Sequence, residues 1–212
     1  MENPVIIFGA NPLGRSAKDI FESNQVVVYG FLDDNKKFHS TEIDDAVVLG
    51  STDDDGFLKL IGKKCEAFVA IDDNKVRRNL VRMLRDVRHV LPVNAVHRLA
   101  MLSPRGTIGY GNYFDAGCST GPGSVIGSHG IFGAGSHIGA ETVIGDFGQV
   151  GAGAIVNPGV TIEEDVFIGT GAVVVSGVTL EKGARIGAGS VVIATVKAGT
   201  TVFGNPAHAV KT

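Results

Sequence analysis

The stretch Ile138-Gly-Ala-Glu-Thr-Val-Ile-Gly-Asp-Phe-Gly-Gln-Val-Gly-Ala-Gly-Ala-Ile-Val156 places an aliphatic residue at every sixth position. The same period continues in both directions, from Ile108 to Ala198, without one insertion. A second recurring position lies two residues before each aliphatic one and holds small or branched side chains such as Ala154. This pattern predicts a hexapeptide solenoid, in which each unit buries its apolar side only by stacking on its neighbours.

Three such units make one turn of a left-handed parallel β-helix, so the sequence predicts about five turns. Glycine commonly follows the aliphatic residue, as in Ile126-Gly127 and Ile168-Gly169, and we expect these glycines to form tight corners between short strands. A flexible glycine-rich linker would carry no phased aliphatic residues, so that alternative is rejected.

Composition divides the chain into two parts. Of the 30 glycines, six lie within residues 1–105 and the other 24 lie after residue 105, whereas only four of the 19 Lys and Arg residues lie after residue 105. We therefore expect an N-terminal domain over residues 1–94, a connection over 95–107 and the β-helix over 108–212. Two modest domains are reasonable for 212 residues.

The N-terminal part has the outline of an α/β nucleotide-binding unit with a short parallel sheet, Rossmann-like in its order of elements. A strand over 4–8 leads through the glycine turn 9–14 into a helix, and a second strand over 25–32 ends in acidic residues. A third apolar run over 67–71 precedes another helix. We expect that helix to bury an apolar stripe, with basic residues on its other faces; the stripe is Val76, Leu80, Met83, Leu84 and Val87.

The glycine turn is a weak match to the dinucleotide motif, because its middle position is Asn11 and the following Pro12 has no N–H. The amides of Leu13 and Gly14 at the helix start remain able to hold one anionic group. An NAD-dependent function is the least favoured of the functions considered. The acidic pairs Asp33-Asp34 and Asp72-Asp73 end predicted strands, where either ligand contact or turn and N-cap roles would suit them.

Charge and composition exclude several classes of protein. A formal net charge of −3 gives no electrostatic case for binding nucleic acid. No apolar stretch approaches the length of a membrane span, and no signal peptide is visible. Two cysteines in different domains favour a reducing cytoplasm, and no metal site is expected because no histidine follows the acidic run 163–165 at ligand spacing.

The order of parts, a small α/β domain followed by a β-helix, resembles the bacterial sugar acyltransferases of the sialic acid O-acetyltransferase type. That family includes the N-acetyltransferases that act on UDP-4-amino sugars and on GDP-perosamine. The resemblance covers nearly the whole chain, and it rests on five segments: Ile7-Phe-Gly-Ala-Asn-Pro-Leu-Gly14, Gly30-Phe-Leu-Asp-Asp-Asn35, Ala70-Ile-Asp-Asp-Asn74, Val143-Ile-Gly-Asp-Phe147 and Gly204-Asn-Pro-Ala207.

The resemblance implies a homotrimer that transfers an acetyl group from acetyl-CoA to an amine or hydroxyl of a nucleotide-linked sugar, in surface glycan precursor synthesis. It places acetyl-CoA in the groove between adjacent β-helices, near Gln149, Thr170 and Ala188. It places the nucleotide sugar on the first domain, with contacts at Asn11, Pro12, Leu13, Asp33, Asp34 and Asp72.

The chain departs from the family where chemistry would occur. The resemblance implies a base histidine at the position of Ala140 and a second histidine at that of Gln149, while the acid after the base is retained as Glu141. The nearest imidazole is that of His137, roughly 10 Å away along an extended strand. His129, at an earlier corner, is a second candidate base. The alternative is a catalytically lapsed trimeric scaffold or nucleotide-sugar binding protein.

Overall fold

The computed structural model describes residues 3–210, and the chain divides into two compact units between Arg98 and Leu99. This division falls within the segment 95–107 that was expected to connect the two domains. Across residues 3–210, no helix has the length and apolar character that crossing a bilayer requires.

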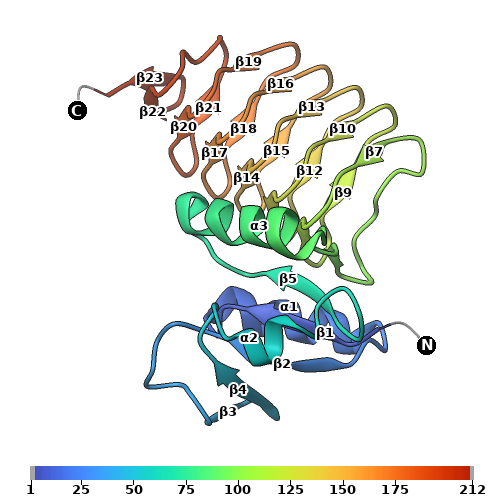
Figure 1. The fold of residues 1–212 in the computed structure, drawn as a ribbon. Helices are drawn as coiled ribbons and strands as arrows, with labels where there is room; N and C mark the ends of the chain where they lie inside the picture. The colour runs from blue at the N-terminus through green and yellow to red at the C-terminus, as the bar shows by residue number, and fades with distance from the viewer. Residues whose placement is uncertain (1–2, 211–212) are drawn as a thin grey trace. The chain divides into compact units, whose positions relative to one another are not determined.

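The first unit is an α/β domain with a five-stranded sheet in the order β3-β4-β2-β1-β5 (Figure 1). Strands β1, β2, β4 and β5 run parallel, and β3 pairs antiparallel with β4. The predicted parallel α/β sheet is thus confirmed. In chain order the elements are β1 (Val5–Phe8), α1 (Pro12–Ser23), β2 (Val28–Leu32), β3 (Glu42–Ile43), β4 (Ala46–Gly50), α2 (Asp55–Leu58), β5 (Glu66–Val69), α3 (Asn74–Arg88) and β6 (Ala95–Val96).

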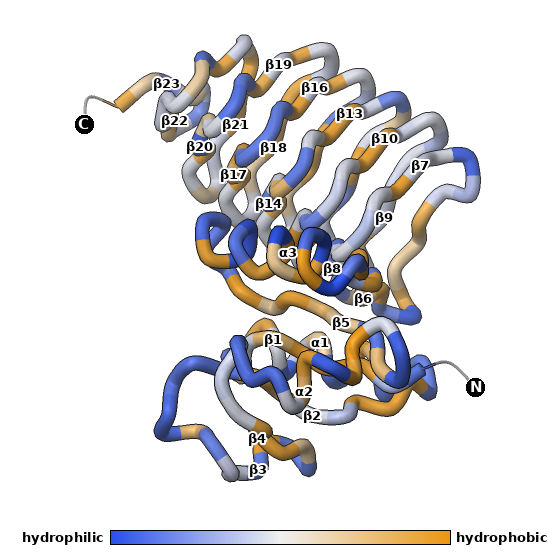
Figure 2. Tube along the Cα trace, viewed as in Figure 1, coloured by the Kyte–Doolittle hydropathy of each residue, from blue (hydrophilic) through white to orange (hydrophobic). Residues whose placement is uncertain are grey.

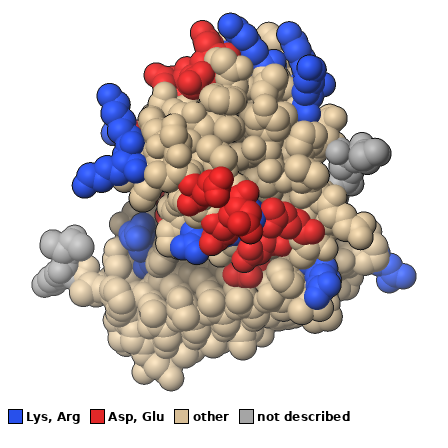
Figure 3. Space-filling view, turned by 90° about the horizontal axis from the view of Figure 1, so that it is seen from below, with Lys and Arg blue, Asp and Glu red and all other residues tan. Residues whose placement is uncertain are grey.

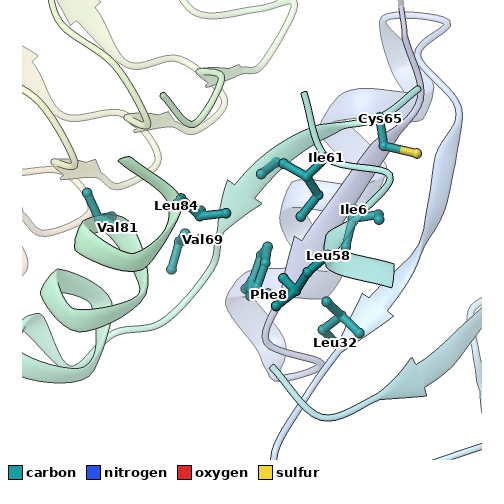
Figure 4. Close-up of a cluster of buried hydrophobic side chains, with 10 residues drawn as sticks. Ile6, Phe8, Leu32, Leu58, Ile61, Cys65, Val69, Val81 and Leu84 are labelled. Carbon is teal, nitrogen blue, oxygen red and sulfur yellow. The ribbon is translucent and has the colours of Figure 1, made fainter. Parts of the chain in front are cut away.

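The core of the first unit forms around β1, whose four residues are all buried because β2 and β5 flank it. Figure 4 shows side chains from three strands, two helices and the turn after α2 converging in one cluster. Its buried members are Ile6, Phe8, Leu32, Leu58, Ile61, Cys65, Ala67, Val69, Val81 and Leu84. This packing fixes the carboxyl ends of the strands, from which the loops of the candidate site emerge.

Helix α3 buries the predicted stripe only in part, since Leu84 is buried and Leu80 and Met83 pack against the core. Val76 and Val87 are exposed, whereas Arg77 and Val81 are buried with Leu84. The reason is hydrogen bonding by Arg77. Its guanidinium donates to the backbone carbonyl of Ile71, just beyond β5, and to the side chain of Asn74. Satisfying those acceptors turns the face that carries residues 77, 81 and 84 inward. A stripe chosen on hydropathy alone could not include an arginine.

The second unit is the predicted left-handed parallel β-helix, with two-residue strands on three sheets (Figure 1). The β7 sheet comprises β7 (Thr107–Ile108), β10 (Val125–Ile126), β13 (Val143–Ile144), β16 (Thr161–Ile162) and β19 (Thr179–Leu180). The β9 sheet comprises β9 (Ser119–Thr120), β12 (His137–Ile138), β15 (Ile155–Val156), β18 (Val173–Val174) and β21 (Val191–Val192). The third contains β8 (Tyr113–Phe114), β11 (Ile131–Phe132), β14 (Gln149–Val150), β17 (Phe167–Ile168), β20 (Arg185–Ile186), β22 (Thr201–Gly204) and β23 (Ala207–Ala209).

Equivalent residues of successive coils are 18 positions apart, as in the pairing of Ile138 with Val156 and of Val156 with Val174. The second residue of these strands points inward and is buried, and the small residues two positions earlier, such as Ala154 and Ala172, are buried too. Figure 2 shows the resulting recurrence of hydrophobic residues from coil to coil. The two inward positions predicted from the period are therefore confirmed.

The glycines that follow the aliphatic residues have a different role from the expected one. A Cβ on Gly139 would lie 2.5 Å from the backbone nitrogen of Pro158 in the next coil, so this glycine permits close stacking of the coils. Left-handed backbone occurs three residues before the aliphatic position instead, as at Gly135, where φ is 65°. Four residues other than glycine adopt this conformation at corners: His129, Glu141, Phe147 and Asp165.

The period ends before Ala198, which is exposed. In the last coil Leu180 forms a bridge with Val196, and Ile186 pairs with Val202, which is a separation of 16 residues in each case. The coil is two residues shorter than the others, because Val196 and Val202 take the inward positions. The sixth-residue spacing alone cannot detect a shortened corner.

Candidate functional site

The loops at the carboxyl ends of β1, β2 and β5 form the candidate site of the first unit. Asn11 caps α1, since its Oδ1 accepts from the Gly14 amide at 3.0 Å. Its Nδ2 donates to the Ala70 carbonyl at 2.8 Å and so joins the loop after β1 to the loop after β5. Pro12 is the first helical residue and Leu13 is half-buried beside it.

Glycine is required at both ends of this turn. A Cβ on Gly14 would lie 1.9 Å from the Gly9 carbonyl oxygen, and one on Gly9 would lie 2.5 Å from the Ala70 carbonyl oxygen. Gly9 also has a φ of 107°, which disfavours other residues. The first and third glycines of the motif therefore keep their packing role, although the middle one is replaced.

The acidic residues at the strand ends shape the loops. The Asp33 carboxylate accepts from the amides of Ala10 and Asn35, each at 2.8 Å. The Asp34 carboxylate accepts from both the amide and the hydroxyl of Thr52 at 2.9 Å. Of the two roles left open for these residues, the turn role is thus present in the folded chain. It engages both carboxylate oxygens of Asp33 and the Oδ1 of Asp34.

The second acidic pair divides its roles. Asp73 caps α3 by accepting from the amides of Val76 and Lys75, and these hydrogen bonds lower the pKa of its carboxyl group. Asp72 is exposed, and its carbonyl oxygen accepts from the Arg77 guanidinium at 3.3 Å. Only Asp72 of this pair presents its side chain at the surface without serving as the helix cap.

Arg15 lies beside the glycine turn and was not predicted from the sequence as a candidate site residue. It lies in the first turn of α1, and its guanidinium makes a bidentate ion pair with Asp44 in the turn between β3 and β4, at 2.6 and 2.9 Å. The hydrogen bond from Arg15 is the main cause that lowers the pKa of Asp44. A cation is unfavourable at a helix N-terminus unless an anion neutralises it, and this imbalance was a usable sequence signal.

Carboxylates form a concentrated group on the face shown in Figure 3, while Lys and Arg side chains lie dispersed around it. In the glycine turn the amides of Ala10, Gly14 and Arg15 are already bonded, to Asp33 and to Asn11.

In the second unit, the corner that follows β12 carries the position implied for the catalytic base. Ala140 is half-buried, and its carbonyl accepts from the Gly159 amide at 2.9 Å. Glu141 has a φ of 58° and an exposed side chain, while its amide donates to the Pro122 carbonyl at 3.0 Å. The corner thus presents a methyl group and a carboxylate.

His137 is exposed on β12, on the outward side of the β9 sheet. Its Nδ1 lies 2.9 Å from the Oγ of Ser119, its partner on β9. The sequence analysis did not single out Ser119. The 18-residue coil could have revealed it, because residues 119 and 137 are one coil apart.

His129 is in a different environment. Its side chain is 7% exposed, and its ring lies against Phe147, with 5.0 Å between the ring centroids. Both residues have left-handed backbone, at equivalent corners of successive coils. The His129 amide donates to the Tyr110 carbonyl at 2.7 Å. This burial disfavours His129 as a base, since a substrate must reach the imidazole.

The three positions implied for acetyl-CoA lie on two parts of the coil. Gln149 is half-buried on β14, while Thr170 and Ala188 are exposed at equivalent corners of successive coils. The Thr170 carbonyl accepts from the Gly189 amide at 2.9 Å. In four successive coils this corner carries a small exposed residue, and we call this row of residues the bare edge. It consists of Ala134, Ala152, Thr170 and Ala188.

No cluster of three or more His, Cys, Asp or Glu residues that could hold a metal ion occurs within residues 3–210. Cys65 and Cys118 are both free and buried.

Two families match parts of the chain. Residues 4–84 match the PglD N-terminal domain, and residues 159–194 match the bacterial transferase hexapeptide, a group of six repeats. The first match lies in the α/β unit and the second in the β-helix. A search of curated proteins gave no significant match.

Several solved structures match along the whole chain. Perosamine N-acetyltransferase from Caulobacter crescentus, solved with CoA and GDP-perosamine, is 27% identical, with a TM-score of 0.91, over 100% of this chain and 99% of that one. WeeI from Acinetobacter baumannii AYE is 25% identical, with a TM-score of 0.87, over 98% and 99% of the two chains. The acetyltransferase domain of PglB from Neisseria gonorrhoeae FA1090 shares the fold at 23% identity, with a TM-score of 0.88, over 99% of this chain and 100% of that one.

The chain thus combines a PglD-type N-terminal domain with hexapeptide repeats, and the solved structures similar to it along its whole length include sugar acetyltransferases. The resemblance inferred from the sequence is confirmed.

Proposed function

We propose that this protein transfers an acetyl group from acetyl-CoA to an amine or hydroxyl of a nucleotide-linked sugar, in the synthesis of surface glycan precursors. The observation that carries the proposal is the likeness along the whole chain to a perosamine N-acetyltransferase solved with CoA and GDP-perosamine. Both units are covered, which supports a site for each substrate in this chain. With two unpaired cysteines, the cytoplasm is the compartment we propose.

The nucleotide sugar is proposed to bind at the carboxyl ends of β1, β2 and β5, where open α/β sheets receive ligands. Asn11, Pro12 and Leu13 would line the turn after β1. Asp33 and Asp34 would hold the loop after β2 in shape, with Asp72 on the opposite side. The hydrogen bonds of Asn11 and Asp33 to neighbouring loops support this role, because they preorganise the site.

Acetyl-CoA is proposed to lie along the bare edge at Thr170 and Ala188, near Gln149, in a groove between two protomers of a homotrimer. Small side chains at this edge support the proposal, since they allow the long, thin pantetheine arm to contact the backbone. The outward apolar residues of the β9 sheet support self-association, since apolar strips at the surface are typical of interfaces. Ile155 is exposed, and Val173 and Val191 are half-buried.

Attack of an amine or hydroxyl on the thioester requires a group that accepts its proton. His137 is our proposed base, because it is the exposed imidazole on the strand that leads into the corner at Ala140. Glu141 would face the same corner and orient the sugar or a water molecule. The burial of His129 argues against this residue as the base.

The second candidate function is a catalytically lapsed scaffold or nucleotide-sugar binding protein. Its support is specific, since Ala140 and Gln149 stand where the family places imidazoles. The two functions differ in turnover. Only the enzyme releases free CoA thiol from acetyl-CoA when a nucleotide amino sugar is present.

The test is calorimetric titration with acetyl-CoA, followed by a thiol-release assay with UDP- and GDP-linked amino sugars. Ala188→Trp should abolish saturable binding at about one site per chain, because the indole fills the bare edge. Lys182→Trp is the matched control at the preceding corner of the same coil and should bind as the wild type does. Absence of wild-type binding up to millimolar acetyl-CoA would refute the assignment, and binding without thiol release would favour the lapsed scaffold.

A further inference from the structure

The outward positions of the β9 sheet form a ladder in which polarity changes abruptly. Ile155, Val173 and Val191 succeed one another in register on β15, β18 and β21. The two strands before them carry Ser119 and His137 at the same outward position. The polar pair of Ser119 and His137 therefore adjoins the apolar strip. His137 lies on β12, the strand that leads into the corner at Ala140.

The backbone holds both members of the pair rigidly. The Ser119 amide donates to the Ser136 carbonyl at 2.9 Å, and the Gly121 amide donates to the Ile138 carbonyl at 2.7 Å. The His137 amide in turn donates to Ala154 of the next coil at 2.9 Å. Because each strand is hydrogen-bonded to its neighbours, the side chains of Ser119 and His137 leave the backbone about 5 Å apart. A serine hydroxyl and an imidazole can meet across that distance.

The contact of 2.9 Å involves Nδ1 of the imidazole, so Nε2 is the nitrogen left for other chemistry. If Nδ1 carries the proton, it donates to Ser119 Oγ and Nε2 presents a lone pair. If Nε2 carries the proton, the serine hydroxyl donates to Nδ1 and the ring has no basic nitrogen to offer. The Ser119 hydroxyl can either accept or donate in this contact, so the direction of the hydrogen bond at Nδ1 determines whether Nε2 is basic.

We propose that Ser119 is the positioning residue that holds His137 in the tautomer with a basic Nε2. This inference rests on the proposed function. As the acceptor nitrogen or oxygen bonds to the thioester carbon, its proton passes to Nε2. When the carbon–sulfur bond breaks, the imidazolium returns that proton to the CoA thiolate. Ser119 accepts the Nδ1 hydrogen bond throughout and stabilises the cation.

The pair of Ser119 and His137 takes over the proton-accepting role of an imidazole at position 140. A carboxylate such as that of Glu141 is ordinarily a weaker base than imidazole, so Glu141 alone is a poor substitute. A general base contributes on the order of 100-fold or more to the rate. Orientation by Ser119 accounts for a smaller share, because Ser119 acts only through His137.

The kinetic test is a double-mutant cycle. His137→Ala should lower kcat about 100-fold. Ser119→Ala should lower kcat about tenfold and displace the acidic limb of the pH profile of kcat, with KM for acetyl-CoA unchanged. Adding Ser119→Ala to His137→Ala should cost nothing further, because the serine has no imidazole left to position. Ser119→Thr should restore the rate by restoring the hydroxyl.

Thr161→Val is the control, since it removes an outward hydroxyl from β16 of the β7 sheet and should leave the kinetics unchanged. Rate losses that multiply in the double variant, or a wild-type rate in Ser119→Ala, would overturn the proposal. So would acetylation of Ser119 itself, detected by mass spectrometry, because the serine would then be a nucleophile.

A nitrogen NMR measurement on His137 tests the pair without turnover. We expect the neutral ring to carry its proton on Nδ1 in the wild type and to shift toward the Nε2-protonated form in Ser119→Ala. An Nε2-protonated wild type would refute the role of Ser119 even if the enzyme is active. Conversely, an Nδ1-protonated ring in a protein that binds acetyl-CoA but releases no thiol would leave the pair intact and refute the proposed transfer reaction.

Discussion

At the scale of single residues, the corner after β12 shows how one side chain changes the chemistry that a fixed backbone can offer. Ala140 keeps the backbone contact between coils, since its carbonyl still accepts from the Gly159 amide. Its methyl group accepts no proton. The corner can therefore be retained structurally while proton transfer moves to His137, which lies on the adjoining strand and already has a hydrogen-bond partner.

The two thiols illustrate how burial sets reactivity. Cys118 is fully buried in the coil, and burial raises the pKa of its thiol to about 11, although the hydrogen bond from Ser136 opposes this rise. Burial also raises the pKa of Cys65. At pH 8 the fraction of Cys118 in the thiolate form is thus about a hundredfold lower than that of an ordinary thiol.

We therefore predict that neither cysteine of the folded protein reacts with a thiol reagent such as DTNB on the timescale of minutes at pH 8. Both should react at once in denaturant, which serves as the control. Rapid modification of one thiol in the folded protein, with its far-UV spectrum unchanged, would contradict the burial of that cysteine.

At the scale of elements, the ion pair between α1 and the turn after β3 joins two segments beside the proposed nucleotide site. Arg15 and Asp44 are both exposed, so their pair contributes little to stability. The amides of Ala10, Gly14 and Arg15 are bonded within the loops, which leaves the Arg15 guanidinium as the prominent donor for a diphosphate. Asp44 then competes with the ligand for that guanidinium.

The competition predicts opposite effects from two variants that break the same ion pair. Arg15→Gln should weaken binding of UDP or GDP about tenfold, because a charge-assisted hydrogen bond is lost. Asp44→Asn should leave the affinity unchanged or increase it severalfold, because the guanidinium becomes available. Isothermal titration measures both, and equal losses in the two variants would show that the pair acts only through the shape of the loop.

The periodic strands of the β-helix were predictable from the sequence, but the partners of buried or paired polar side chains were not. Residues 18 apart repeat one environment, so the strands and their inward positions follow from spacing. The stripe on α3 was right for Leu84 but missed the buried Arg77, which satisfies the carbonyl of Ile71. The shortened last coil was missed because Ala198 has an aliphatic side chain at an expected position. The partners of Asp33 and His137 come from other segments, and only the folded chain brings these together.

At the scale of the whole molecule, the proposed function needs an assembly, because acetyl-CoA is proposed to lie in a groove between two protomers. The outward strip of Ile155, Val173 and Val191 on the β9 sheet offers an apolar surface for that assembly. Ile155 is 41% exposed in the single chain. Burying an unpaired charge on such a surface costs several kcal/mol, which is enough to dissociate an assembly of this kind.

We predict that Val173→Asp converts a trimer into monomers in analytical ultracentrifugation and abolishes acetyl-CoA binding at the same time. Binding of UDP or GDP should persist, because the nucleotide site is proposed to lie within the first unit of one chain. Thr161→Asp, which places the same charge on the outward side of the β7 sheet, is the control and should remain trimeric. A persistent trimer would exclude the β9 sheet as the interface, and monomers that bind acetyl-CoA with undiminished affinity would show that the groove does not lie between protomers.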